Sequence, residues 1–204
     1  MQSPVLVLHG IWNSGHWMRP LAWRLRSAGI DARAWGYPSV LGGPDAVLPA
    51  LAAEVRRLGC RGLVGYSLGG LLALELLRSE PALGIERVVC LGSPLGGSGT
   101  ACWLVAHRLG WVLGRSAALL QAGEAAWPCT VRIGQVAGRR PRGIGRLLGA
   151  QGLESDGTVG LAETRWPGLA DHCVVDASHT GLPFNREAAQ RVARFLHSGR
   201  FSPD

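Results

Sequence analysis

The sequence predicts an α/β fold in which a mostly parallel sheet of about six strands lies between two layers of helices. Short apolar runs alternate along the chain with helical patterns, which is the rhythm of consecutive β-α units. The chain has 204 residues, of which 47% are hydrophobic and 17% charged, so it can bury a substantial core and does not belong to the disordered class. We expect a three-layer α/β/α sandwich formed by a single domain, residues 1–204.

The first half of the chain contains three strand–helix pairs. Residues 4–8 form a near-continuous apolar run, and the helical stretch 17–28 that follows ends before Gly29. Pro44 stands in the first turn of the next helical stretch and Gly59 follows its last residue, an asymmetry that is typical of helix ends. We therefore expect strands at 4–8, 30–35 and 62–66, and helices at 17–28, 44–58 and 69–79.

The second half continues the alternation with one longer interruption. Residues 101–120 are apolar helical material between the fourth and fifth strand candidates. No internal repeat and no domain boundary is evident. We expect strands at 86–91, 130–136 and 172–176 and a closing helix at 186–197.

Composition argues against a membrane-spanning or secreted protein. No apolar run reaches the roughly 18 residues that a transmembrane helix needs, so we expect no stable membrane insertion. The N-terminus has no basic start and no small-residue cleavage site, and it is typical of a first strand. The five cysteines are dispersed without a C-x-x-C pair, which favours reduced, mostly buried thiols and a cytoplasmic location.

The formal net charge is +7, and arginine supplies all of the 21 basic residues. Such an excess is compatible with an anionic partner, but the arginines are spread along the chain, which favours compositional bias. One cluster, residues 139–146, has no interleaved aromatic residues and therefore lacks a stacking platform for single-stranded nucleic acid. We expect no nucleic-acid partner, and a solvated loop at this cluster.

Ser67 lies in the stretch G65-Y66-S67-L68-G69, between an apolar strand candidate and a helix candidate. A serine at such a sharp turn exposes its hydroxyl at the end of the sheet, and the flanking glycines leave room for the close backbone crossing. The helix that follows directs its N–H groups and its positive dipole end at the same place. An ordinary glycine-rich turn is the alternative, but the strand-to-helix context favours a nucleophile.

A nucleophilic serine needs a base, and that base needs an orienting carboxylate. Of the histidines after Ser67, His179 directly follows the last strand candidate, whereas His172 opens that strand at the opposite end of the sheet. Asp156 lies in the polar loop before the last strand and is the preferred acid. The alternatives for the acid are Glu154 and Asp176, followed by Glu163 and Asp171.

Two N–H donors are expected for an oxyanion. The amide after the nucleophile, that of Leu68, is one, and the loop after the first strand, L8-H9-G10-I11-W12, supplies the other. The N–H of Ile11 is the preferred second donor. We expect His9 to fix this loop by hydrogen bonding and not to act as a catalyst.

With these segments the chain resembles the α/β-hydrolase superfamily, and more narrowly its small lipase- and esterase-like members with a minimal cap. The resemblance covers nearly the whole chain and includes L-H-G-I-W, G-Y-S-L-G-G, L-G-S-P-L-G-G-S, S-D-G-T-V and S-H-T-G-L. It implies an acyl-enzyme on Ser67, with His179 and Asp156 completing a triad, and no metal or organic cofactor. The large lid insertions of some members are absent.

The expected substrate is a small-molecule ester or lipid with an apolar acyl group. Apolar side chains follow the strand ends, and no charged residue is obviously placed to hold a substrate carboxylate. The alternatives are a thioesterase or acyltransferase on the same triad, or a catalytically silent protein that uses the fold for binding. The expected substrate-binding residues are Trp12, Trp17, Tyr37 and Leu95.

Overall fold

The computed structural model describes residues 3–125, 130–142 and 154–202. Its centre is one sheet with the strand order β2-β1-β3-β4-β5-β6, in which all neighbouring strands are parallel. The predicted class, a sandwich around a mostly parallel sheet of six strands, is confirmed. The strands are β1 Val5–Leu8, β2 Ala32–Trp35, β3 Gly62–Tyr66, β4 Arg87–Leu91, β5 Arg132–Gly138 and β6 Asp171–Val175.

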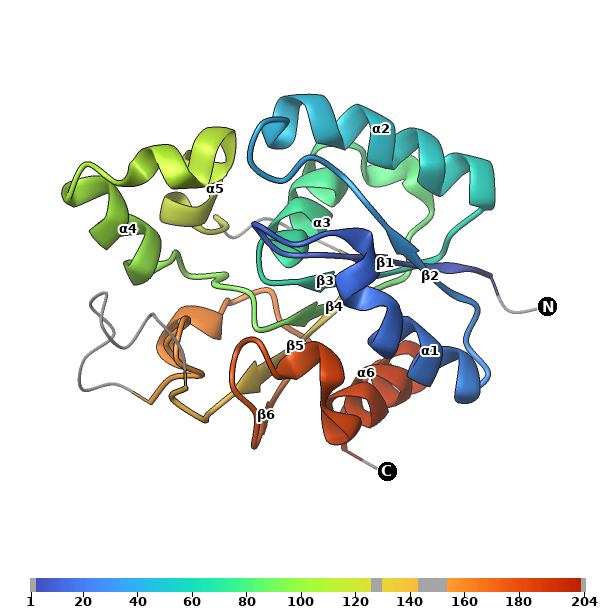
Figure 1. The fold of residues 1–204 in the computed structure, drawn as a ribbon. Coiled ribbons are helices and arrows are strands. Elements are labelled where there is room, and N and C mark those ends of the chain that lie inside the picture. Colours follow the sequence, from blue (N-terminus) through green and yellow to red (C-terminus); the bar gives the residue numbers. More distant parts are fainter. Residues whose placement is uncertain (1–2, 126–129, 143–153, 203–204) are drawn as a thin grey trace.

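Helices cover both faces of the sheet (Figure 1). One face carries α1 (Arg19–Ser27) and α6 (Arg186–Ser198), and the other carries α2 (Gly43–Leu58) and α3 (Leu68–Ser79). Because successive side chains of a strand point to opposite faces, Leu63 and Val64 of β3 belong to two separate core clusters, one under each helical layer. Short 3-10 turns complete the connections: η1 Gly15–Met18, η2 Pro81–Leu83, η5 Ala162–Thr164 and η6 Leu182–Phe184.

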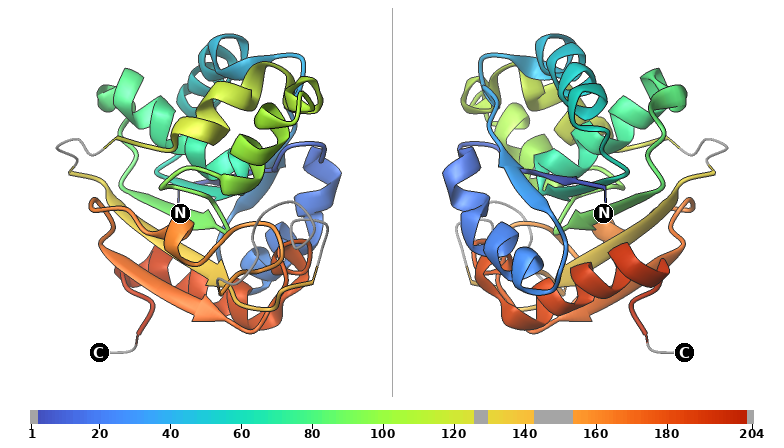
Figure 2. Two further views of the ribbon diagram at one scale, coloured as in Figure 1. Left: turned by 90° about the vertical axis from the view of Figure 1, so that its left-hand side faces the viewer. Right: turned by 90° about the vertical axis from the view of Figure 1, so that its right-hand side faces the viewer.

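Residues 99–122, here called the cap segment, lie at the carboxyl end of the sheet (Figures 1 and 2). The predicted helical material is present, but it is divided into α4 (Gly99–Ala106), the 3-10 segment η3 (Gly110–Ser116) and α5 (Ala117–Ala122). The chain kinks at Gly114, where φ is 54° and a Cβ would lie 2.2 Å from the Val40 carbonyl oxygen. The cap segment thus packs directly on the loop after β2.

Most predicted boundaries differ from the structure by one or two residues, and two of these differences have a clear physical reason. The first helix was expected at 17–28, but α1 begins at Arg19 after a 3-10 turn, with Pro20 in the first turn, where its missing N–H is not needed. The fifth strand was expected at 130–136 and instead spans Arg132–Gly138, because its pairing with β6 continues to the pair Gly138 and Val175. A pairing between strands fixes that end, and the local sequence does not encode it.

The cysteines only partly match expectation. Cys60 and Cys90 are buried, Cys102 is exposed and Cys173 is half-buried, and all four carry free thiols. The prediction that the thiols are mostly buried is therefore met by two of these four cysteines. Cys129 lies outside the described residues. Within the described ranges no helix is both long and apolar enough to cross a membrane. The arginine cluster is described only as far as Arg142.

Candidate active site

Ser67 occupies the turn between β3 and α3 in a strained backbone conformation, with φ 53° and ψ −119°. Positive φ is rare for residues other than glycine and persists only where the surroundings impose it. A Cβ on Gly65 would lie 2.3 Å from the Gly69 carbonyl oxygen, and one on Gly69 would lie 2.7 Å from the His9 carbonyl oxygen. The two glycines thus allow strand, helix and the loop after β1 to cross in contact.

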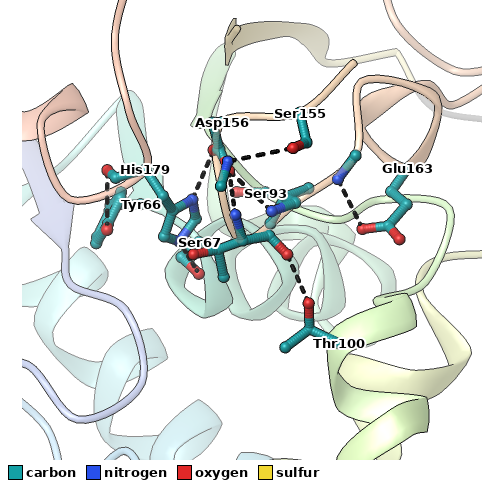
Figure 3. A network of polar contacts seen from close by, with 12 residues as sticks. Tyr66, Ser67, Ser93, Thr100, Ser155, Asp156, Glu163 and His179 are labelled. Carbon is teal, nitrogen blue, oxygen red and sulfur yellow. Dashed lines mark hydrogen bonds and ion pairs between the residues drawn. The ribbon is translucent and has the colours of Figure 1, made fainter. Parts of the chain in front are cut away.

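His179 lies between Ser67 and Asp156 (Figure 3). Its Nε2 is 3.1 Å from the Ser67 hydroxyl oxygen, and its Nδ1 is 2.7 Å from the Asp156 Oδ2. The exposed fraction is 7% for Ser67, 6% for His179 and 1% for Asp156. The three residues that the sequence placed on separate loops therefore form one shielded hydrogen-bonded chain.

The carboxylate of Asp156 is held by its own loop. Its Oδ1 accepts the N–H groups of Thr158 at 3.0 Å and Val159 at 2.8 Å, so that Oδ2 is left to face the imidazole. The carbonyl oxygen of Asp156 also accepts the N–H of His179 at 2.9 Å. Acid and base are thus joined by backbone as well as by side chain, which fixes the ring orientation.

The alternative acids lie elsewhere. Glu154 is exposed, and Asp176 is exposed and forms two hydrogen bonds with Arg140, at 2.6 and 2.5 Å. Asp171 accepts the N–H groups of His172 and Phe201 at the amino end of β6. Among the acids considered from the sequence, Asp156 is the one that contacts His179 in the structure.

Two glycines that sequence reasoning did not select leave room for the acid–base pair. At Gly92, φ is 61° and a Cβ would lie 3.3 Å from the His179 Nδ1 and 3.4 Å from the Asp156 Oδ2. A Cβ on Gly138, the last residue of β5, would lie 2.9 Å from the Asp156 Cβ. Their position at the carboxyl ends of β4 and β5 was the available signal, and it marks where loops approach the sheet closely.

Tyr66 also supports the base and was not selected. Its hydroxyl donates to the His179 carbonyl oxygen at 3.1 Å, and the ring centroids of the two residues are 5.1 Å apart. Burial raises the pKa of Tyr66, so the phenol remains a protonated donor. Tyr66, which precedes Ser67 in the sequence, therefore holds the backbone of His179, whose ring faces Ser67.

The two predicted oxyanion donors come from segments that meet at Ser67. Leu68 is the first residue of α3, where a helix has no acceptor for the N–H. A Cβ on Gly10, the neighbour of Ile11, would lie 3.0 Å from the Ser67 Cβ. The loop after β1 is thus in contact with the nucleophile turn, which is the arrangement that a two-donor site needs.

His9 is completely buried beneath this loop and stacks on Tyr37, with ring centroids 4.1 Å apart. Its Nε2 accepts the N–H of Tyr37 at 3.2 Å, so its Nδ1 carries the proton donated to the Gly10 carbonyl oxygen at 2.8 Å. Burial lowers the pKa of His9, which favours this neutral form. The hydroxyl of Tyr37 donates to the His9 carbonyl oxygen at 2.5 Å, so this predicted substrate-binding side chain contacts the loop.

The other predicted substrate-binding residues lie at different depths. Trp12 is 60% exposed, has a φ of 59° and donates its indole N–H to the Val112 carbonyl oxygen of the cap segment at 2.7 Å. Trp17 is partly exposed and meets Phe184 edge-to-face at 5.1 Å. Leu95 is completely buried within the core under the cap segment.

Polar contacts tie the cap segment to the acid loop, and sequence reasoning did not anticipate them. The Thr100 hydroxyl donates to the Thr158 carbonyl oxygen at 2.7 Å. The carboxylate of Glu163, labelled in Figure 3, accepts the N–H of Gly99 at 3.0 Å and that of Gly160 at 3.1 Å. Burial raises the pKa of Glu163. The start of α4 is therefore held against the loop that carries Asp156.

No protein-family model and no curated protein matches the sequence. Among solved structures, a Bacillus licheniformis lipase in its mature form matches with a TM-score of 0.75 and 22% identity, over 97% of this chain and 92% of that one. A type II thioesterase from the borrelidin biosynthetic cluster matches with a TM-score of 0.66 and 20% identity, over 97% of this chain and 92% of that one. A pyrethroid hydrolase matches with a TM-score of 0.69 and 12% identity, over 97% of this chain and 99% of that one. At these identities the likeness establishes the fold, which is that of the α/β-hydrolases.

Proposed function

We propose that the protein is a serine hydrolase that cleaves carboxylic esters with an apolar acyl group through an acyl-enzyme on Ser67. The hydrogen-bonded chain from the Ser67 hydroxyl through His179 to Asp156 carries this proposal. The structural neighbours named as a lipase, a thioesterase and a pyrethroid hydrolase support the reaction class. The same arrangement of serine, histidine and acid recurs on unrelated folds that catalyse acyl transfer through a serine.

In the first half-reaction the Ser67 Oγ attacks the ester carbonyl carbon while its proton passes to the His179 Nε2. Asp156 accepts the Nδ1–H and stabilises the imidazolium that forms. The N–H groups of Leu68 and Ile11 bind the oxyanion, where removal of one donor typically costs about 10²–10³ in kcat. The carbonyl re-forms, the alkoxy group leaves with the proton from Nε2, and Ser67 remains acylated.

In the second half-reaction a water molecule replaces the alcohol. His179 takes a proton from this water as the oxygen attacks the acyl carbon, and the tetrahedral intermediate then expels the Ser67 oxygen. The proton on Nε2 returns to that oxygen, which releases the carboxylic acid and restores the enzyme. The alternatives are thioester cleavage and acyl transfer to another alcohol. The same triad would serve either reaction, because His179 can protonate a thiol leaving group and can deprotonate an alcohol in place of water.

Labelling with a fluorophosphonate probe and hydrolysis of short p-nitrophenyl esters test the proposal. We expect stoichiometric labelling of the wild-type protein, no labelling of Ser67→Ala, and a loss of at least about 10⁴ in kcat with the fold retained. Folded wild-type protein that neither labels nor hydrolyses would instead favour the binding role. Matched esters and thioesters of graded acyl length, with and without an added alcohol acceptor, separate esterase, thioesterase and acyltransferase.

A further inference from the structure

The exposed apolar side chains of the described residues are concentrated at one end of the molecule. Nine large apolar side chains are exposed, of which Trp23 lies on α1 and Val174 within β6. The other seven lie in the loops, 3-10 turns and cap segment that follow the carboxyl ends of strands. Single exposed apolar residues are normal, whereas a concentration on one surface marks an interaction site. The aromatic and leucine side chains of this set, here called the apolar rim, are Trp12, Trp17, Leu41, Leu109, Trp111 and Phe184.

The segments that carry the apolar rim are in direct contact. The Trp12 indole donates to the carbonyl oxygen of Val112, the neighbour of Trp111. The Arg115 N–H donates at 3.0 Å to the carbonyl oxygen of Val40, the neighbour of Leu41. The rings of Trp17 and Phe184 meet edge-to-face. Loops after β1, β2, β4 and β6 therefore present the rim together at the carboxyl end of the sheet.

The rim borders the candidate active site but extends further outward than its reacting atoms. Trp12 directly follows Ile11. Phe184 lies two residues after Leu182, whose N–H donates to the His179 carbonyl oxygen at 3.2 Å. Leu41 is 82% and Trp111 75% exposed, whereas Ser67 is 7% exposed. Side chains as exposed as these do not enclose a bound acyl chain. They are placed to contact a surface outside the protein from which a substrate would enter the site.

Charge at this end of the molecule favours an anionic partner. Arg108 and Arg115 of the cap segment and Arg139 and Arg142 after β5 are exposed, and none of the four has a salt bridge within the described part of the chain. Tryptophan next to arginine suits the headgroup region of a bilayer, where the indole bridges apolar and polar layers. The leucines of the rim have no stacking or hydrogen-bonding capacity, which favours lipid over nucleic acid.

We propose that the apolar rim seats the protein peripherally on an anionic lipid surface, with the candidate active site facing that surface. This inference rests on the proposed ester hydrolysis and names its substrate class: apolar esters that are held in the lipid layer. The exposed arginines then lie near the headgroups and add an attraction that salt weakens.

Vesicle flotation with the full chain tests the surface without turnover. In the Ser67→Ala background we expect binding to vesicles of phosphatidylglycerol, weaker binding to phosphatidylcholine, and at least about tenfold weaker binding after Leu41→Ser with Trp111→Ser, since two large apolar side chains no longer enter the lipid. Trp23→Ser is the matched control. Trp23 is 61% exposed but lies on α1, beside a groove of about 930 Å³ shared with α6 that contains none of the triad candidates.

Activity supplies the second readout, with Ser67 intact. We expect the Leu41/Trp111 double variant to hydrolyse a short soluble ester at the wild-type rate and an ester embedded in phosphatidylglycerol vesicles at least about tenfold more slowly. Normal hydrolysis of both esters by the double variant, or an equal loss in the Trp23 control, overturns the inference.

Two other occupants of the rim are excluded by further measurements. A concentration-dependent dimer in sedimentation velocity that the double variant loses would assign the rim to a second copy of the chain. Rim-dependent binding of an oligonucleotide without vesicle binding would assign it to nucleic acid. Rim-dependent flotation of Ser67→Ala combined with an inert wild-type protein contradicts the proposed ester hydrolysis while retaining the lipid-binding surface.

Discussion

The nucleophile turn, residues 65–70, and the acid loop, residues 155–160, serve the same candidate triad but are held in place differently. In the turn, the backbone of β3 contacts the backbone of α3 so closely that a Cβ on Gly65 would overlap the Gly69 carbonyl oxygen, and only glycine fits there. In the loop, Asp156 is positioned by N–H donors, and the loop is tied to Thr100 and Glu163 by hydrogen bonds. Substitutions in the turn should therefore act through overlap, and substitutions in the loop through lost polar contacts.

The largest effect is expected for Asp156→Asn. An amide at this position cannot hold the Nδ1–H tautomer of His179, so kcat for a short ester should fall by about 10⁴ with little change in the fold. Steady-state kinetics with thermal unfolding as the check on folding measures this. Asp176→Asn is the matched control, because Asp176 is an exposed acid that pairs with Arg140, and its kcat should stay near wild type. Equal losses in the two variants would disprove the assignment of the acid.

The next effect is expected for Gly65→Ala in the nucleophile turn. The new Cβ would lie 2.3 Å from the Gly69 carbonyl oxygen, so the backbone must shift, and we expect a loss of about 3 kcal/mol in the free energy of unfolding, the upper end of the usual range for overpacking. Gly36→Ala is the control, since a Cβ there would lie 3.6 Å from the Gly15 nitrogen, which is ordinary van der Waals contact. Urea denaturation of both variants gives the comparison. A Gly65→Ala protein as stable as Gly36→Ala would show that the turn is not held by close packing.

Glu163, which holds the acid loop, adds a pH dependence of stability between acidic and neutral pH. Burial raises its folded pKa above the ordinary value, so between the two values the folded state binds more protons than the unfolded state, and stability falls as pH rises. We expect the free energy of unfolding of wild type relative to Glu163→Gln to decrease from acidic to neutral pH. Denaturation curves across that range measure it; parallel pH profiles of the two proteins would contradict the assignment.

The smallest effect is expected for Thr100→Val. This change removes the hydroxyl bonded to the Thr158 carbonyl oxygen at nearly constant shape, and a lost hydrogen bond of this kind typically costs about 1 kcal/mol. If the cap segment supports the acid loop, kcat should also fall several-fold while KM changes little. Thr164, whose hydroxyl bonds its own 3-10 turn and His172, offers the control Thr164→Val, with a stability loss but no change in kcat.

The sequence by itself was sufficient to predict the features that neighbouring residues determine, namely the strands, the helices and the turn at Ser67. The alternation of apolar runs and helical patterns predicted six strands and the layered class, because each element has to bury its own apolar face. The motif around Ser67 predicted the strand–turn–helix, because neighbouring residues form it. His179 was selected from its place after the last strand, and the structure brings it to Ser67 at 3.1 Å.

Tertiary structure decided what depends on segments distant in the sequence. The choice among five acids rested on chain order, and only the folded loop shows that Asp156 reaches the imidazole while Asp176 pairs with Arg140. The roles of Gly92 and Tyr66 were not evident, because the site residues that they meet, Asp156 and His179, lie more than 60 positions away in the sequence. Sequence thus determined the elements and their order, whereas contacts across the carboxyl end of the sheet fixed the site, because distances between loops are set only when the sheet has formed.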